Sequence, residues 1–386
     1  MRRVLLLPSP PNSGSMGSVI KLIGIAKKLR DLGHTVAFVM GGSLVQLIKR
    51  ENFLVYPYPI PQNKGFVEDI KNAIDFFNWT GMMDMDFFSQ AIKDEVQAIR
   101  CFKPDVLFSE TRLSASISAS ITGTPLFSIA CWPCSPRFSI NNIDENHQIC
   151  EVNKVLKNYG VPAINNVTEL VYSRADKKIA PTIPILEPEL AEEPDVIFTG
   201  YILDLNYDEQ SVPDWLKKES DKPLIFVYPS VGALQPHLYS RLLSETFDGS
   251  SYRVICACGY HKEIQELPAD TPNVRFVRYI PSPMVLERAS MVIFHGGQDS
   301  MLSNLLYGIP SIAIPGKHFE REYNTANLVK AEAALHLPVY GFRKNRLLKA
   351  TEEVLHGQYR EKCKSLSCLL KSYGGTDMCI DMIVSF

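Results

Sequence analysis

Short apolar runs alternate with segments of helical spacing along most of the chain. The apolar runs have the length of buried strands, and they are VLLL (4–7), TVAFVM (35–40), LVYPY (54–58), DVLFS (105–109), PLFSIA (125–130), DVIFTG (195–200), PLIFVYPS (223–230), YRVICAC (252–258), NVRFVRYI (273–280), MVIF (291–294) and SIAIP (311–315). Helical spacing is found at 19–32, near 43–51, at 67–101, near 113–122, and at 144–159, 236–247, 300–307 and 322–335. Strands that alternate with helices form parallel sheets covered by helices on both faces, so the pattern predicts an α/β fold.

One polar segment divides this pattern into two halves. The chain has 386 residues, which is too long for one compact core and suits two domains. Residues 201–222 are polar and lack a periodic apolar face, and the strand pattern restarts at 223. We therefore expect two doubly wound domains, 1–200 and 223–370, joined by a linker at 201–222. Ligands of such sheets bind outside the carboxyl ends of the strands, which we expect to face a shared central cleft.

Composition narrows the partners to small molecules. Hydrophobic residues make up 46% of the chain, charged residues make up 21%, and the formal net charge is -2. Nucleic acids and anionic membranes attract basic surfaces, so neither is expected as a partner. The nine cysteines have no disulfide spacing, and the apolar run in MRRVLLLPSPP is too short for a signal peptide. Gly123 and Pro125 interrupt the uncharged stretch 113–136, so we expect no membrane insertion and a cytoplasmic protein.

The sequence HGGQDSMLSNLLYGIP (295–310) follows a buried run and begins a helix. The first backbone N–H groups of a helix have no partner within it and lie at the positive end of its dipole, so they bind anions such as phosphate. Gly296 and Gly297 would let the backbone approach such an anion. The alternative is an ordinary helix start without a ligand, capped by the side chain of Asp299 or Ser300.

The following residues carry a resemblance to a known family. After the helix come G-I-P, the strand SIAIP, and a loop with Glu320, Arg321 and Asn324 before another helix. This order resembles the donor-site signature of nucleotide-sugar-dependent glycosyltransferases of the GT-B fold, which include plant and antibiotic sugar transferases. The resemblance covers most of the chain and implies two Rossmann-like doubly wound parallel-sheet domains. It also implies that residues 371–386 form a helix that crosses back to the first domain.

The resemblance assigns roles to the residues of the second domain. Those that would bind the nucleotide and its diphosphate are Ser230 in VYPSVG (227–232), Tyr279 near the nucleobase, Ile280 through its backbone, His295 at the diphosphate, and Gly297, Asp299 and Ser300 at the other phosphate. Glu320 and Arg321 stand where the family has an acidic residue and Gln that bind sugar hydroxyls. The Arg is a departure from the family pattern. Ser303 replaces a Glu that grips the ribose in many members, which leaves UDP- and TDP-sugars both open; it could also be a solvated helix residue.

A second departure lies in the first domain. NSGSMGSVIKL (12–22) resembles the family's first loop and helix, in which a G-H pair places a catalytic His, but here the pair is Gly17-Ser18. Transfer with inversion needs a base to remove the acceptor's proton, and Ser18 cannot do this unaided. The family's acidic partner of that His corresponds to Glu110. Burial could make this carboxylate a usable base, so the catalytic candidates are Glu110 and Ser18.

Other interpretations of these residues remain open. Glu110 could instead pair with Arg112 or cap the following helix. His147 is a second candidate base, and Asp84 and Asp86 are weaker ones. The aromatic and methionine residues at 66–88 could line an apolar acceptor pocket or form plain core.

The sequence therefore predicts an inverting glycosyltransferase. The co-substrate would be a UDP- or TDP-sugar, and the acceptor a small hydrophobic molecule such as a natural product. No cofactor is expected, and no metal either, since phosphates held by helix amides need none and no acidic metal cluster accompanies the predicted phosphate loop. Two alternatives are a sugar-nucleotide epimerase of the same fold and a non-catalytic relative that serves as a binding or scaffold protein.

Overall fold

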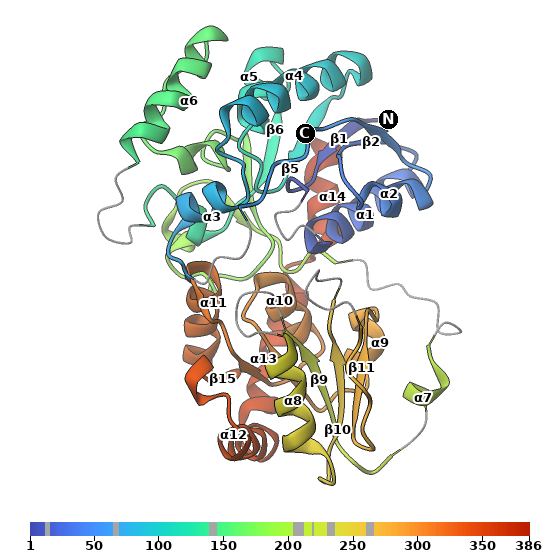
Figure 1. Ribbon diagram of the computed structural model, residues 1–386. Helices are drawn as coiled ribbons and strands as arrows, with labels where there is room; N and C mark the ends of the chain where they lie inside the picture. The colour runs from blue at the N-terminus through green and yellow to red at the C-terminus, as the bar shows by residue number, and fades with distance from the viewer. Residues whose placement is uncertain are drawn as a thin grey trace. The chain divides into compact units, whose positions relative to one another are not determined.

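The computed structural model divides the chain into two units (Figure 1). The first comprises Met1–Asp204 and Tyr373–Phe386, and the second comprises Leu205–Ser372. The structure describes residues 1–11, 16–64, 69–138, 145–203, 212–217, 220–229, 236–259 and 266–386.

The first unit is built around a parallel sheet of seven strands in the order β3-β2-β1-β5-β6-β7-β8. Its strands are β1 (Arg3–Leu7), β2 (Thr35–Val39), β3 (Leu54–Tyr56), β5 (Val106–Ser109), β6 (Leu126–Ile129), β7 (Lys177–Ala180) and β8 (Val196–Phe198), and β4 (Asp69–Ile70) lies outside this sheet. Its helices are α1 (Met16–Asp31), α2 (Val45–Arg50), α3 (Ala73–Trp79), α4 (Met85–Phe102), α5 (Ala115–Thr122), α6 (Asn146–Asn158) and α14 (Thr376–Ser385). The strand order changes direction between β1 and β5, which is where doubly wound sheets bind ligands.

Helices cover both faces of this sheet because alternate residues of each strand point to opposite sides. Val4 and Leu6 of β1 pack in the core formed with α1 and α14. Leu5 and Leu7 pack in a second core, formed with α4 and α5. All four side chains are fully buried.

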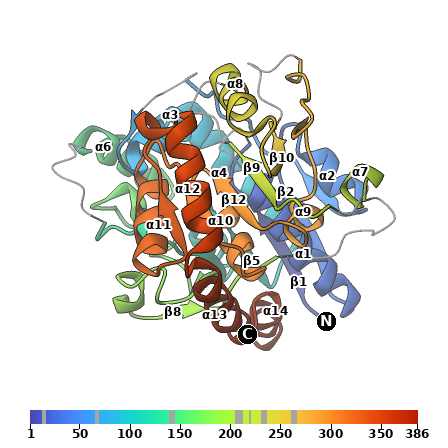
Figure 2. The same ribbon diagram turned by 90° about the horizontal axis from the view of Figure 1, so that it is seen from below.

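The second unit repeats this plan with six parallel strands in the order β11-β10-β9-β12-β13-β15. The strands are β9 (Leu224–Tyr228), β10 (Arg253–Ala257), β11 (Val274–Val277), β12 (Met291–Phe294), β13 (Ser311–Ala313) and β15 (Ala334–His336), with β14 (Lys317–His318) outside the sheet. The helices are α7 (Asp214–Lys217), α8 (Pro236–Phe247), α9 (Ser282–Leu286), α10 (Gln298–Leu306), α11 (Phe319–Lys330), α12 (Lys344–His356) and α13 (Tyr359–Ser372). Helices α8 and α12 share a core with the sheet, and α13 lies beside α10 (Figure 2). The direction of the strand order changes between β9 and β12.

These two sheets confirm the predicted α/β class with doubly wound parallel sheets. Two strands of these sheets escape the sequence pattern: β7 reads KKIA, in which lysines interrupt the apolar run, and β15 follows α11 so closely that the sequence places it in that helix. The uncharged stretch 113–136 contains α5 and β6. Among the described residues, no helix has both the length and the apolar character that a membrane span requires.

The segment expected as a linker, 201–222, contains more structure than its polarity suggests. Ile202 is buried in the core of the first unit. Helix α7 belongs to the second unit, where Leu216 is buried. Single apolar residues in a polar segment do not produce a periodic face, so the pattern could not reveal them.

Candidate active site

The candidate donor residues of the second unit lie at the change of strand direction. Strands β9 and β12 are neighbours, with Tyr228 opposite Phe294, and His295 follows β12 directly. The rings of Tyr228 and His295 have their centroids 5.7 Å apart. Two polar rings therefore stand at the carboxyl edge of the sheet, where ligands of this architecture bind.

Two glycines shape the turn that follows His295. Gly296 has a φ of +83°, and a Cβ there would lie 2.7 Å from Oγ1 of Thr325, so glycine is needed both for the conformation and for the close approach of α11. A Cβ on Gly297 would lie 2.5 Å from Nε2 of His295. The imidazole thus lies against Gly297, the residue directly before α10.

The N-cap residue of α10 is Gly297, which has no side chain to cap the helix. The alternative in which Asp299 or Ser300 caps this helix is wrong, because both residues lie inside its first turn. A helix start with a glycine N-cap at the ligand-binding edge, with an imidazole beside it, is suited to a phosphate group.

Glu320 and Asn324 of α11 complete this turn. The backbone N–H of Gln298, the first residue of α10, donates to Oε1 of Glu320 at 3.5 Å. The amide of Asn324 donates both to that oxygen, at 3.2 Å, and to the carbonyl oxygen of Gly296, at 3.1 Å. The carboxylate predicted to bind sugar hydroxyls therefore lies at the helix start predicted to bind phosphate.

Burial governs the charge of this cluster. It raises the pKa of Glu320, although the nearby Arg321 and the hydrogen bonds from Gln298 and Asn324 act in the opposite direction. Burial also lowers the pKa of Arg321, and the charge of Glu320 opposes that change. Tyr228 lies close enough to Arg321 for the guanidinium to favour its ionised form, while burial raises its pKa. Arg321 therefore joins the ring pair and the helix start in one site.

Two serines considered for the donor site from the sequence remain, Ser303 and Ser230. Ser303 is 4% exposed, so its interpretation as a solvated helix residue is wrong. Within the described part of the chain, its Oγ has no hydrogen-bond partner. Ser230, predicted to contact a phosphate, lies outside the described residues.

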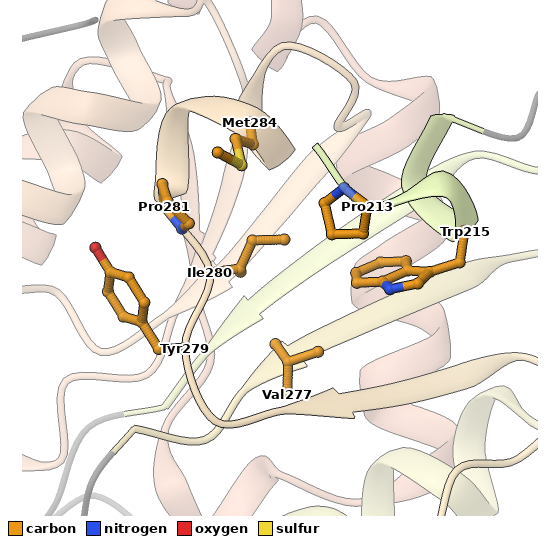
Figure 3. Close-up of a pocket in the computed structure, with 7 residues that line it drawn as sticks. All are labelled: Pro213, Trp215, Val277, Tyr279, Ile280, Pro281 and Met284. Atoms are coloured by element: carbon orange, nitrogen blue, oxygen red, sulfur yellow. The ribbon is translucent and has the colours of Figure 1, made fainter. Parts of the chain in front are cut away.

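The predicted nucleobase segment borders an apolar pocket of about 300 Å³ (Figure 3). Its lining residues are Pro213, Trp215, Val277, Tyr279, Ile280, Pro281 and Met284. The side chain of Ile280 points toward Pro213, whereas the ring of Tyr279, 49% exposed, points to the other side (Figure 3). Nothing in the sequence pattern indicates that Trp215 lies here, because it belongs to the polar segment 201–222. The Arg275 guanidinium lies over the indole ring of Trp215, with its carbon 4.7 Å from the ring centroid, in a cation–π contact.

The two catalytic candidates of the first unit lie close together at the corresponding edge of the other sheet. Glu110 follows β5, and its N–H donates to the carbonyl oxygen of Leu7 at the end of β1. Ser9 connects the candidates: its N–H donates to Oγ of Ser18 at 2.9 Å, and its hydroxyl donates to the carbonyl oxygen of Glu110 at 3.1 Å. Ser18 and Glu110 are 5% and 7% exposed.

Glu110 forms an ion pair with Lys21 of α1, with 2.9 Å between Nζ and Oε1. The alternative in which it pairs with Arg112 is wrong, because Arg112 is fully buried with Glu95 as its ionic partner. Lys21 was missed by the sequence interpretation. It lies three residues after Ser18, on the buried face of α1 beside Val19 and Leu22, and a lysine in such a place must have a partner.

The remaining candidate bases, Asp84, Asp86 and His147, lie at the start of α4 and on α6. Asp84 is the N-cap of α4 and accepts a hydrogen bond from the N–H of Phe87, and Asp86 lies in the first turn of that helix. His147 is exposed on α6. Of the apolar residues at 66–88, Phe77 and Phe88 are buried core, and Phe66 lies outside the described residues.

The comparisons with known proteins agree with this arrangement. Residues 253–368 match the family described as Erythromycin biosynthesis protein CIII-like, C-terminal domain. An uncharacterized glycosyltransferase of Methanosarcina mazei is 22% identical over 386 residues, covering 93% of each chain. The two parallel sheets and the solved structures that follow show the GT-B fold that the resemblance of the sequence predicts, and the relative named here is a glycosyltransferase.

Solved structures share the fold over the whole chain. The glycotransferase of kitacinnamycin matches 99% of this chain and 98% of its own with a TM-score of 0.79 at 19% identity. Spinosyn Rhamnosyltransferase SpnG complexed with thymidine diphosphate matches 99% of both chains with a TM-score of 0.73 at 14% identity. SpnG complexed with the spinosyn aglycone matches 99% of this chain and 100% of its own, with a TM-score of 0.70 at 15% identity.

Proposed function

We propose that this protein transfers a sugar from a UDP- or TDP-sugar to a small hydrophobic acceptor, with inversion at the anomeric carbon. The observation that carries the proposal is the turn between β12 and α10, where His295 lies against the glycine N-cap of a helix at the ligand-binding edge of the sheet. A nucleotide-binding and aglycone-binding relative of the same fold, SpnG, supports both substrates.

In this proposal the second unit holds the donor. His295 and the amides at Gly297, Asp299 and Ser300 bind the diphosphate, with Ser230 as a further donor, and Tyr279 and the Ile280 backbone receive the nucleobase. Glu320 and Arg321 contact the sugar, where Asn324 already fixes the carboxylate. The positive end of α10 stabilises the charge that develops on the leaving diphosphate, so we propose that no metal or other cofactor is needed.

Glu110 is the proposed general base. A single displacement by the acceptor's oxygen inverts the anomeric carbon and requires that oxygen to lose its proton. Ser18 binds Ser9 rather than acting on a proton by itself. Glu110→Gln should lower the turnover number by about a hundred- to ten-thousand-fold and leave nucleotide affinity unchanged.

The departure at Ser18 favours one other function, that of a non-catalytic relative that binds a sugar nucleotide. The nine cysteines have no disulfide spacing in the sequence, which supports the further proposal of a reducing, cytoplasmic location.

A donor panel separates these functions. The purified protein is incubated with UDP- and TDP-sugars, with and without phenolic and alcoholic acceptors, and nucleotide release and product mass are followed. Acceptor-dependent release that persists in EDTA supports the proposal. Nucleotide binding without transfer to any acceptor supports the non-catalytic function, and loss of turnover in EDTA with recovery in Mg²⁺ contradicts metal independence.

A further inference from the structure

Lys21 and Glu110 form a buried ion pair at the ligand-binding edge of the first sheet. Their side chains are 2% and 10% exposed, so the lysine is the deeper partner and the carboxylate lies nearer the surface. Burying two charges costs several kcal/mol and is offset only by good geometry. Many hydrophobic pairs of similar volume would stabilise this junction as well, so stability alone gives no reason for the pair.

The backbone at Glu110 carries a second unusual feature. The next residue, Thr111, has a φ of +47°. This conformation is costly for a β-branched side chain and is found mainly where a functional geometry requires it. The carbonyl oxygen of Glu110 is also fixed by the hydroxyl of Ser9. The backbone of Glu110 is therefore held by Leu7 and Ser9, and its carboxylate is held by Lys21 of α1.

The charged groups near Glu110 have separate partners. Lys21 of α1 pairs with the Glu110 carboxylate, and the Ser9 hydroxyl, beyond the end of β1, donates to the Glu110 carbonyl oxygen. Arg112, two residues further along, is directed to Glu95, 3.2 Å away, and to the carbonyl oxygens of Pro8 and Val39. Arg112 therefore holds the backbone at Pro8 and Val39, whereas Lys21 binds the carboxylate of Glu110.

We propose that Lys21 is the positioning residue of an acceptor-activating pair in which Glu110 is the base, and that this pair selects acceptors with an acidic hydroxyl, above all phenols. The inference rests on the proposed sugar transfer. In the expected His–carboxylate pair the deeper group is negative and favours proton uptake by the base. Here the deeper group is positive and favours the ionised carboxylate before the transfer, which weakens the base. A weak base suits a hydroxyl that releases its proton readily.

The proton and electron pairs balance without a further reactant. As the acceptor's oxygen forms its bond to the anomeric carbon, its proton passes to the Glu110 carboxylate. The bond between the anomeric carbon and the diphosphate breaks, and its electron pair stays on the phosphate oxygen. Lys21 keeps its proton throughout, and the neutral Glu110 then loses its own to solvent.

The pH dependence of transfer tests the role of Lys21. The ratio kcat/KM is measured from pH 4 to 9 with one phenol, for the wild type, Lys21→Met and Lys21→Arg. Removing an opposite charge raises the pH at which a carboxylate ionises by about 1 to 3 units, so the acidic limb of the Lys21→Met profile should move upward by that amount. Lys21→Arg should restore the original limb. An unmoved limb in active Lys21→Met would show that Lys21 acts on stability alone, and would overturn the inference.

A series of acceptors tests the selectivity. Ring-substituted phenols, whose pKa values lie around the value of about 10 known for tyrosine, are compared with benzyl alcohols of matched shape. The wild type should transfer to phenols at least about a hundredfold faster, the lower range expected for general-base catalysis. Equal rates for matched phenol and alcohol would contradict the selectivity.

Controls distinguish failure of this inference from failure of the proposed function. UDP and TDP binding is measured for every variant, since no transfer by the wild type to any acceptor, with nucleotide bound, rejects the sugar transfer itself. If Lys21→Met does not fold, the double variant Lys21→Met/Glu110→Gln removes both charges and leaves no unpaired ion. With Ser18→His added to supply a conventional base, the resulting triple variant should transfer to alcohols and phenols with a smaller difference in rate; an unchanged difference would overturn the selectivity.

Discussion

The imidazole of His295 lies so close to Gly297 that a methyl group there would stand 2.5 Å from Nε2. The backbone of Gly297, with a φ of -66° and a ψ of 143°, would itself accept alanine without strain. Gly297→Ala should therefore displace the imidazole and little else. We expect it to weaken UDP or TDP binding by about 1 to 3 kcal/mol, the range for a lost charge-assisted hydrogen bond, as measured by calorimetry.

A double-mutant cycle controls this prediction. Once His295 is replaced by alanine, the methyl group meets no imidazole, so Gly297→Ala should add nothing. Additive losses would show that Gly297 acts independently of His295.

Glu320 should oppose nucleotide binding when it is ionised. Its carboxylate accepts a hydrogen bond from the first amide of α10, where the diphosphate is proposed to bind. Burial raises its pKa, so the group is neutral at low pH and becomes charged only as the pH rises. Glu320→Gln should therefore strengthen UDP binding by about 1 kcal/mol at pH 8 and by less at pH 5. Comparing the two proteins at each pH cancels the titration of UDP. A constant difference would contradict the assigned position of the diphosphate.

Arg112 should be the most costly single charge to remove from the first unit. Its side chain is 0% exposed, pairs with Glu95, and stacks on Tyr58 with 3.8 Å to the ring centroid. Removing one partner of a buried pair costs about 3 to 5 kcal/mol. Arg112→Met should lower the free energy of unfolding by that amount in urea titrations. The added change Glu95→Gln should recover part of the loss, and no recovery would show that Arg112 acts through the loops rather than through the pair.

His318 should make the fold sensitive to acid. Burial lowers its pKa from 6.5 to about 3. Between these values the unfolded chain binds a proton that the folded chain does not, so stability falls as the pH drops below 6.5. The contribution is at most about 1.4 kcal/mol for each pH unit. His318→Gln should lose less free energy of unfolding between pH 7 and pH 5 than the wild type does; equal losses would place the acid sensitivity elsewhere.

The sequence predicted features that depend on local order. The turn at Gly296 and the helix after it follow from a short apolar run, two glycines and helical spacing within twenty residues. The parallel sheets follow from the same kind of pattern. Resemblance to glycosyltransferases added roles for residues whose spacing along the chain matches a signature.

Features that depend on distant residues were missed. Lys21 and Glu110 are 89 positions apart, and nothing in either segment indicates that they meet. Trp215 lies in a polar segment, and most residues that line its pocket belong to β11 and the segment after it. The lysines of β7 lie at the start of a strand whose buried end is Ile179 and Ala180, too short a pair for an apolar run. In each case the feature depends on tertiary contacts, which the hydrophobic periodicity of the sequence does not indicate.

Calorimetric titration of UDP and TDP into the wild type and His295→Ala tests the central claim most directly. We predict that the wild type binds at least one of the two nucleotides without added metal, and that His295→Ala binds it about 1 to 3 kcal/mol more weakly with an unchanged unfolding temperature. Failure of the folded wild type to bind either nucleotide, or equal affinity of the folded variant, would contradict a nucleotide-sugar site at His295.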